Sequence, residues 1–132
     1  MNAMPPRTRA HLDITDFTCD PAAITRVLAI APSSTWEAGA PRVPQGGPVH
    51  RTPGWRLNSL VGPGEPLTTH AMWLLGHLPS SLEALSSVTE HWSVLLSFAI
   101  DLDGEAPEMY FDASIIARLG SLNAAVDIDC YP

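Results

Sequence analysis

The sequence predicts an α+β fold in which helices cover one face of a largely antiparallel sheet of about four or five strands. Some stretches alternate apolar and polar residues, others repeat apolar residues at helical spacing, and the two kinds are interspersed along the chain. Strands with one apolar and one polar face need helices on one side only, so a two-layer sandwich is expected. A ferredoxin-like arrangement is one version, because the first and last thirds each look like a strand–helix–strand unit.

The first strand and the first helix follow a flexible tail, which we expect over residues 1–9. The stretch HLDITDF alternates apolar and polar residues, which is typical of a half-buried strand. Asp20 is a good N-cap and Pro21 suits the first helical turn, so a helix is predicted to begin there and to end at Pro32. At this chain length, residues 10–132 are expected to fold as a single domain.

The middle of the chain is rich in proline and glycine, and residues 33–54 are predicted to form a loop. Seven of the 13 prolines lie between Pro32 and Pro66, and the stretch shows neither strand nor helix periodicity. The stretch WRLNSL that follows alternates again, which predicts a strand in which Trp55 points into the core.

A long helical pattern and the clearest strand come next. From Leu67 to about Val88, apolar residues fall at helical spacing, and Pro79 is expected to kink the helix or to restart it. The stretch HWSVLLSFAIDLD alternates over its whole length and predicts a strand. A short strand at MYF, a helix capped by Asp112 and a last strand at AVDIDCY complete the expected order.

The uneven charge of the chain limits the classes of partner. The net charge is −7; residues 1–60 hold six arginines and four acids, whereas residues 61–132 hold one arginine and ten acids. An acidic second half argues against nucleic acid, which needs a basic surface. It suits a protein partner with a basic surface, or it serves solubility.

Localisation and cofactors are inferred from segments and spacings. No apolar run approaches the ~20 residues that span a bilayer, and no signal peptide is recognised at the N-terminus. Cys19 and Cys130 make neither a disulfide framework nor a zinc site. His70 and His77 are too far apart on one helix to share a metal, so we interpret them as flanking or half-buried polar residues. We therefore expect a cytoplasmic protein with no cofactor, no metal and no membrane partner.

Several landmarks together resemble a known family. They are DPAAITRVLAIAPSSTWEAG, the pair Gly54 and Trp55, and the terminal VDIDCY. In this order they are similar to the helix opening, the Trp-x-x-Gly loop, the strand tryptophan and the Asp-x-Asp-x-Tyr ending of the bacterial domain-of-unknown-function family numbered 4279. The similarity covers about residues 11–131, and Ala29 departs from the Leu-Gly pair usual at this helix end. The resemblance implies a compact α+β domain and assigns no activity.

The last strand contributes candidate site residues. Asp127 and Asp129 lie on one strand face, with Cα atoms roughly 7 Å apart for a rise of ~3.3 Å per residue. Paired carboxylates can hold a hard cation or share acid and base roles. The alternative is a solvated sheet face on which Asp–Arg pairs contribute little. The same face is expected to carry Asp101 and, from other strands, His11, Asp13, Arg56 and Asn58.

The predicted loop contributes a second group. Trp36 and Trp55 bracket Arg42, His50 and Arg51, and tryptophan and arginine are typical of ligand sites and protein hot spots. The alternative is that each tryptophan anchors a loop end in the core. We adopt this interpretation for Trp55 and expect Trp36 to be the more exposed of the two.

These observations favour a small cytoplasmic binding or protein-interaction module, with an immunity-type protein that neutralises a basic partner as one version. The alternative is an enzyme or small-ligand binder with a pocket between residues 33–55 and the polar sheet face. The binding module is preferred because the sequence contains no nucleophile elbow, C-x-x-C, H-E-x-x-H or phosphate-loop motif. The residues expected to contact a ligand or partner are Trp36, Arg42, His50, Arg56, Asp101, Asp127, Asp129 and Tyr131.

Overall fold

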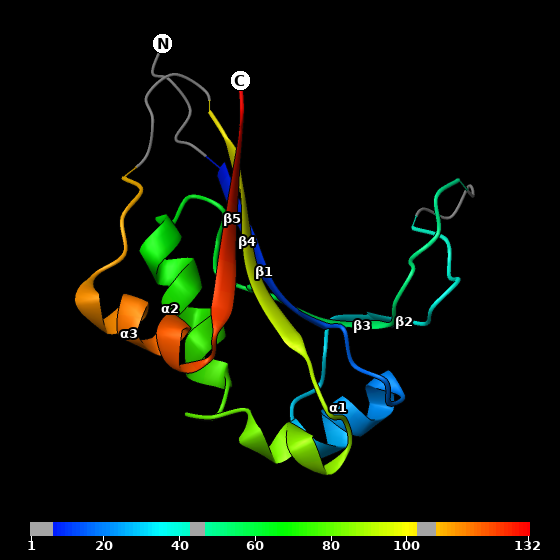
Figure 1. Ribbon diagram of the computed structural model, residues 1–132. Helices are drawn as coiled ribbons and strands as arrows, with labels where there is room; N and C mark the ends of the chain where they lie inside the picture. The colour runs from blue at the N-terminus through cyan, green and yellow to red at the C-terminus, as the bar shows by residue number, and fades with distance from the viewer. Residues whose placement is uncertain (1–6, 43–46, 103–107) are drawn as a thin grey trace.

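The protein is a single five-stranded sheet with helices on one side, as seen in a computed structural model that describes residues 7–42, 47–102 and 108–132 (Figure 1). The strand order is β2-β3-β1-β4-β5, and every neighbouring pair is antiparallel except β4 and β5. The predicted α+β sandwich is therefore confirmed. The elements in chain order are β1 (Arg7–Thr15), α1 (Pro21–Leu28), β2 (Ser34–Trp36), β3 (Gly54–Asn58), α2 (Leu67–His77), the 3₁₀-helix η1 (Glu83–Ser87), β4 (Ser93–Asp101), α3 (Ala113–Ser121) and β5 (Ala124–Tyr131).

The core lies between the sheet and the helices, which all pack on the same side of it (Figure 1). Trp55 is fully buried there, as predicted, and its indole N–H donates to the hydroxyl of Thr25 on α1 at 3.0 Å. The strand alternation is confirmed, because every second residue of β1, β3 and β4 enters this core. The largest fully buried side chains are Trp55, Phe98, Leu12, Ile14, Ile24, Leu67, Leu74, Leu85, Leu96, Ile100 and His70.

The two predicted helix N-caps, Asp20 and Asp112, are confirmed. The Asp20 carboxylate accepts from the Ala22 N–H at 2.9 Å, and the Asp112 carboxylate accepts from the Ile115 N–H at 2.9 Å. The end of α1 comes earlier than predicted, because Ala29 takes a left-handed conformation with φ 57° and closes the helix before Pro32.

The long helical pattern breaks before Pro79. Helix α2 ends at His77, Leu78 is extended, and the pattern resumes only as the short 3₁₀-helix η1. Leu78 precedes a proline, and a residue in that position is disfavoured in helical conformation. The Arg118 side chain then donates to backbone carbonyls of this break, namely those of Leu75, Leu78, Pro79 and Ser80.

Two boundaries predicted from the sequence are wrong. Strand β1 begins at Arg7, inside the tail expected over residues 1–9. It starts this early because β4 extends to Asp101, which pairs with Arg7. Residues 1–6 lie outside the described part of the chain. The short strand at MYF does not form, since β5 rather than this segment pairs with β4. Phe111 packs instead against the core, with its ring centroid 5.7 Å from that of Phe98.

The topology also decides the ferredoxin-like alternative. That arrangement needs a parallel strand–helix–strand unit in each half of the chain. Strands β1 and β2 both pair antiparallel with β3, so β1–α1–β2 is one such unit, and β3 and β4 both pair antiparallel with β1, so β3–α2–β4 is the other. The order β2-β3-β1-β4 is consequently ferredoxin-like, and β5 is a fifth strand added parallel to β4.

The region predicted as a loop over residues 33–54 contains a strand and a hairpin. Ser34–Trp36 forms β2, which pairs antiparallel with the first three residues of β3. The described residues 37–42 and 47–53, which we call the arm, lie beside each other: the Gly39 N–H donates to the His50 carbonyl at 2.8 Å, the His50 N–H donates to the Ala40 carbonyl at 2.9 Å, and Pro41 forms an isolated bridge with Val49. Figure 1 shows the arm projecting from the β2–β3 end of the sheet, away from the helices.

Candidate functional site

The face of the sheet opposite the helices, which we call the open face, carries most of the predicted site residues. Residues that are directly opposite in register point to the same side, so the pairing of the five strands aligns side chains in rows across the sheet. One row is Asn58, His11, Ser97 and Asp127; the next is Ser34, Arg56, Asp13, Leu95 and Ala125; a third is Trp36, Gly54, Thr15 and Ser93.

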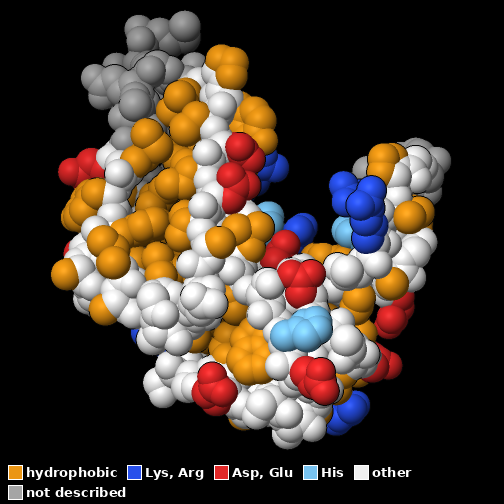
Figure 2. All heavy atoms as spheres, in the orientation of Figure 1, with side chains coloured by type: hydrophobic (Ala, Val, Ile, Leu, Met, Phe, Trp, Pro, Cys, Tyr) orange, Lys and Arg blue, Asp and Glu red, His pale blue; other side chains and the backbone are white. Residues whose placement is uncertain are grey.

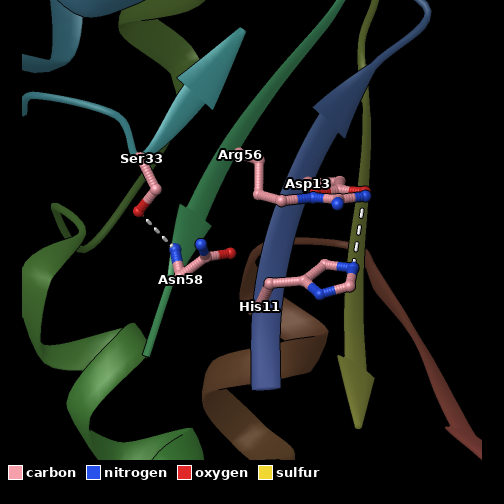
Figure 3. A network of polar contacts seen from close by, with 5 residues as sticks. All are labelled: His11, Asp13, Ser33, Arg56 and Asn58. Carbon is pink, nitrogen blue, oxygen red and sulfur yellow. Dashed lines mark hydrogen bonds and ion pairs between the residues drawn. The ribbon is translucent and has the colours of Figure 1, made fainter. Parts of the chain in front are cut away.

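Asp13, Arg56 and His11 form a polar cluster at the centre of the open face (Figure 3). The Arg56 guanidinium donates from Nε and Nη2 to the two carboxylate oxygens of Asp13, at 2.7 and 2.9 Å. His11 Nε2 lies 3.7 Å from the same carboxylate. Asp13 is buried, with only 7% of the residue exposed. The hydrogen bonds with Asp13 raise the pKa of Arg56 above its ordinary value.

Trp36 extends this cluster toward the arm. Its ring lies over Gly54, where a side chain would overlap the indole, and the Arg56 guanidinium carbon is 5.2 Å from the ring centroid. The His50 ring stacks on Trp36 with centroids 4.6 Å apart. We call the continuous set of His50, Trp36, Arg56, Asp13 and His11 the open-face ladder.

The protonation of His11 reflects its burial first and the charges around it second. Burial lowers the pKa of His11 below its ordinary value of 6.5, Asp13 acts to raise it, Arg56 to lower it and Asp127 to raise it, and the net result is a lowered pKa. The influence of Asp127 follows from the register, since only Ser97 separates the two residues in their row. The neutral imidazole can therefore accept or donate a hydrogen bond near neutral pH.

The predicted site residues fall into three places. Trp36, His50 and Arg56 come together in the open-face ladder, and Asp127 reaches it through the row of His11. Asp129 lies one row further, and Asp101 and Tyr131 share the row of Arg7, at the opposite end of β1 from the row of Trp36. Arg42 is exposed on the arm, where its backbone N–H donates to the Pro48 carbonyl.

Sequence reasoning named His11 and Asp13 as members of the polar face but did not single them out as site residues. Their contact with Arg56 depends on the antiparallel register of β1 and β3, which pairs Asp13 with Arg56. The signal available in the sequence was one charged residue at a polar position of each of two alternating strands. Such a pattern predicts which face of the sheet the residue lies on, but only the strand pairing shows which residue it contacts.

The open face is hollowed (Figure 2). We call this hollow the trough: the ladder lies on its floor, β5 is one wall and the arm is the other. Asp127 and Asp129 are exposed on β5, and Arg42 and Arg51 are exposed on the arm. Figure 2 shows acidic side chains on the first wall and basic side chains on the second, so the two walls carry opposite charge.

A cavity of about 590 Å³ lies along the first half of β1 and shares His11 and Arg56 with the open-face ladder. Its lining includes Arg7, Arg9, His11, Arg56, Asn58 and His70. The pocket expected between residues 33–55 and the sheet was to be lined by Trp36, Arg42 and His50, and none of these three lines this cavity. The cavity therefore lies on the side of His11 away from the arm.

His70 is a fully buried core residue, whereas the sequence predicted a flanking or half-buried one. It is 1% exposed, and its Nδ1 lies 2.8 Å from the Ser59 hydroxyl. Burial lowers the pKa of His70 below its ordinary value of 6.5, although the Gly62 carbonyl and Glu65 act to raise it. Ser59 also accepts from the Val61 N–H at 3.2 Å, so one hydroxyl connects His70 to the backbone of this turn. His70 thereby fastens the turn after β3 to α2.

Two further observations concern classes of site. Within the described residues, no group of three or more His, Cys, Asp or Glu side chains is placed to hold a metal ion. Over the same ranges, no helix combines the length and the apolar character that crossing a membrane requires.

Comparison with known proteins assigns the family. A family described as a domain of unknown function, DUF4279, matches residues 6–132. The chain belongs to this family. The resemblance predicted from the sequence is thus confirmed. No curated protein and no solved structure matches the chain.

The residues that carried the resemblance have structural explanations in this DUF4279 domain. Trp36 and Gly54 are one unit, because the glycine leaves room for the indole ring. Gly39, which completes the Trp-x-x-Gly loop, has φ +87°, a conformation that favours glycine at the base of the arm. The motif thus positions the open-face ladder and the arm relative to each other.

Proposed function

We propose that this DUF4279 domain is a small cytoplasmic protein-interaction module that takes a segment of a partner protein into the trough. The observation that carries the proposal is the trough itself: a hollow on a helix-free sheet face, with walls of opposite charge. Opposed charged walls orient a bound segment and favour partners with complementary charges. Two free cysteines, Cys19 and Cys130, are consistent with a reducing compartment.

The floor of the trough supports the proposal. Trp36 is held flat on Gly54, and Arg56 is held by two hydrogen bonds to Asp13, so both are ordered before a partner arrives. Tryptophan and arginine dominate the energetics of protein interfaces, and ordering them in advance lowers the entropic cost of binding. The second terminal nitrogen of Arg56, Nη1, is not used by Asp13 and points to a role in partner contact.

The charges of the walls define the partner. Basic groups of the partner face Asp127 and Asp129, and acidic groups face Arg42 and Arg51. The chain as a whole has a net charge of −7, which steers a basic partner toward it and makes association faster at low salt. An immunity-type protein that neutralises a basic partner is the version of this proposal that we favour.

The test is to co-express the chain with each protein encoded beside its gene and to measure complexes by calorimetry. We expect one complex whose affinity falls about tenfold or more in Asp127→Asn/Asp129→Asn and in Arg42→Gln/Arg51→Gln. The matched control is Glu83→Gln/Glu90→Gln, which removes two exposed acids away from the open face. A complex that is insensitive to both trough variants and to Trp36→Ala would contradict the proposal.

A second candidate function is binding of a small anionic molecule in the 590 Å³ cavity. Three arginines in its lining, Arg7, Arg9 and Arg56, favour an anion. Any ligand of the native state raises the melting temperature, so a thermal-shift screen of phosphates and carboxylates tests this function. A shift abolished by Arg9→Gln but retained in Trp36→Ala would favour the cavity over the trough; no shift with any anion would exclude it.

A further inference from the structure

Strand β5 is an unpaired edge. It pairs with β4 on one side, and no strand of the described residues pairs with the other side. Its residues from Ala125 to Tyr131 are all exposed. At eight residues it is far longer than the opposite edge strand β2, which has three. Native proteins usually shorten or cover such edges, because the free backbone groups are a template for another strand.

The direction of each free backbone group follows from the contact with β4. The Tyr131 carbonyl accepts from the Leu102 N–H at 2.7 Å, so the peptide groups of Tyr131 face β4. Both backbone groups of a residue in a parallel strand point to one side, and the side alternates along the chain. Asp127 and Asp129 therefore also bond toward β4, whereas the N–H and C=O groups of Val126, Ile128 and Cys130 face outward.

The side chains along this edge differ between its two faces. On the open face stand Asp127 and Asp129. On the helix face, Val126 and Ile128 are each 40% exposed, although the sequence pattern predicted an apolar face packed in the core. Helix α3 leaves Ile116 on its own surface 58% exposed, and Figure 2 shows a broad hydrophobic area on the helix side of β5. An acidic row and an apolar row thus flank the line of free backbone groups.

We propose that the outer edge of β5 binds an extended segment of a partner protein by strand addition, with basic side chains on the open face and apolar side chains on the helix face. Backbone hydrogen bonds to Val126, Ile128 and Cys130 supply affinity, and the alternating side chains supply specificity. Lysine or arginine of the added strand lies opposite Asp127 and Asp129, and apolar residues cover Val126 and Ile128. This inference rests on the proposed function in one respect, that the partner is a protein.

The acidic row disfavours a second copy of this chain as the occupant. If two β5 strands paired antiparallel about Ile128, Asp127 of each would lie opposite Asp129 of the other. In a parallel pair in register, each aspartate would lie opposite itself. Like charges directly opposite in a sheet are destabilising. The charges that prevent self-pairing are the same ones that select a basic strand.

The direct probe is a capped peptide that alternates lysine and valine, added to the isotope-labelled full chain and followed by NMR. We expect the amides of Val126, Ile128 and Cys130 to shift and to exchange more slowly, because they gain hydrogen bonds. The amides of Asp127 and Asp129 already bond to β4 and change less. Equal binding by a peptide of the same composition with its lysines in one block, or by one that alternates glutamate and valine, would overturn the proposal.

N-methylated peptides test the backbone contacts. In an antiparallel pair the valine N–H groups of the peptide face β5, and in a parallel pair the lysine N–H groups do. Methylating all valines in one peptide and all lysines in another therefore removes the needed donors from only one of the two. One methylated peptide should bind and the other should not, and the result gives the strand direction. Strand addition is overturned if both bind alike or neither binds.

Variants of the chain complete the test. Ile128→Pro removes an outward N–H and no bond to β4, so it should keep the fold and weaken the peptide about tenfold. Asp127→Asn/Asp129→Asn should weaken the lysine peptide and make its affinity less sensitive to salt. Trp36→Ala disrupts the trough and should leave peptide binding unchanged. This variant therefore distinguishes failure of the strand-addition proposal from failure of the trough proposal. Unchanged peptide affinity in a folded Ile128→Pro variant would overturn the proposal.

Discussion

At the scale of single residues, the open face depends on a position without a side chain. Gly54 is the first residue of β3, and a methyl group there would overlap the indole of Trp36. The absence of that methyl leaves room for Trp36, whose ring stacks with that of His50 and has the guanidinium carbon of Arg56 5.2 Å from its centroid. A glycine normally weakens a strand, so its presence here is explained by the close approach of the tryptophan.

Gly54→Ala should therefore lower the free energy of unfolding by about 1–3 kcal/mol, the usual cost of overpacking. In a Trp36→Ala background the same change should be neutral or slightly stabilising, because the clash is gone and alanine is the better strand residue. Urea denaturation of the four proteins gives the coupling between the two positions. Equal costs in both backgrounds would show that Trp36 does not occupy the space over Gly54.

Buried histidines make stability depend on pH. Burial lowers the pKa of both His70 and His11 below the ordinary value of 6.5, so the unfolded state binds protons that the folded state does not. Stability is then fully present above about pH 6.5 and falls as the pH drops below it, by up to about 1.4 kcal/mol per pH unit for each histidine. His70→Gln should flatten this dependence, and His70→Gln/His11→Gln should flatten it further. Denaturation curves between pH 7.5 and pH 5 measure the effect; an unchanged slope in the double variant would refute it.

At the scale of elements, helix ends are where the sequence is both most informative and most in conflict with the fold. The aspartate caps of α1 and α3 form as predicted. The far end of α1, however, requires a left-handed residue, and the chain has Ala29 there with φ 57°. A residue with a Cβ atom is strained in this conformation, whereas glycine is not.

We expect Ala29→Gly to stabilise the protein by about 0.5–1 kcal/mol, because release of the strain exceeds the added entropy of the unfolded chain. The control is Ala117→Gly, at an exposed helical position of α3, which should destabilise by about 1 kcal/mol. Thermal and chemical denaturation distinguish the two. If both glycines destabilise equally, the left-handed geometry at Ala29 is not strained.

At the scale of the whole molecule, the core and the binding surfaces are separate. None of the described residues of the arm is buried, and the core lies entirely on the helix side of the sheet. The trough and the β5 edge are likewise outside it. Surface changes in these regions can therefore alter partner binding while the domain remains folded.

Replacing residues 38–51 with a short turn should consequently leave the melting temperature within about 4–8 °C of the original, which corresponds to ~1 kcal/mol for a small domain. It should abolish binding in the trough, whose second wall is lost, and leave the lysine–valine peptide on β5 unaffected. Differential scanning fluorimetry and the NMR titration measure these effects. A shortened chain that fails to fold would show that the arm contributes to the core, contrary to its exposure.

The patterns that predicted the fold are local ones. Alternation in β1, β3 and β4 and the carboxylates of Asp20 and Asp112 depend on residues a few positions apart, so they can be recognised without knowing the topology. The candidate site is different. Trp36, Arg56 and Asp127 were predicted as site residues, but their order across the sheet was not, because a strand pattern indicates a face and does not indicate which strand lies beside it.

The sequence by itself determined the α+β class, the buried Trp55, the break near Pro79 and the family, since periodicity, capping and proline geometry act over short stretches of chain. Only the tertiary structure decided that β1 lies between β3 and β4, and that placement joins Asp13 to Arg56 and brings His11 near Asp127. It also left β5 at the edge with Val126 and Ile128 exposed. Strand order and register arise from hydrogen bonds between segments far apart in the chain, and those bonds created both the trough and the free edge.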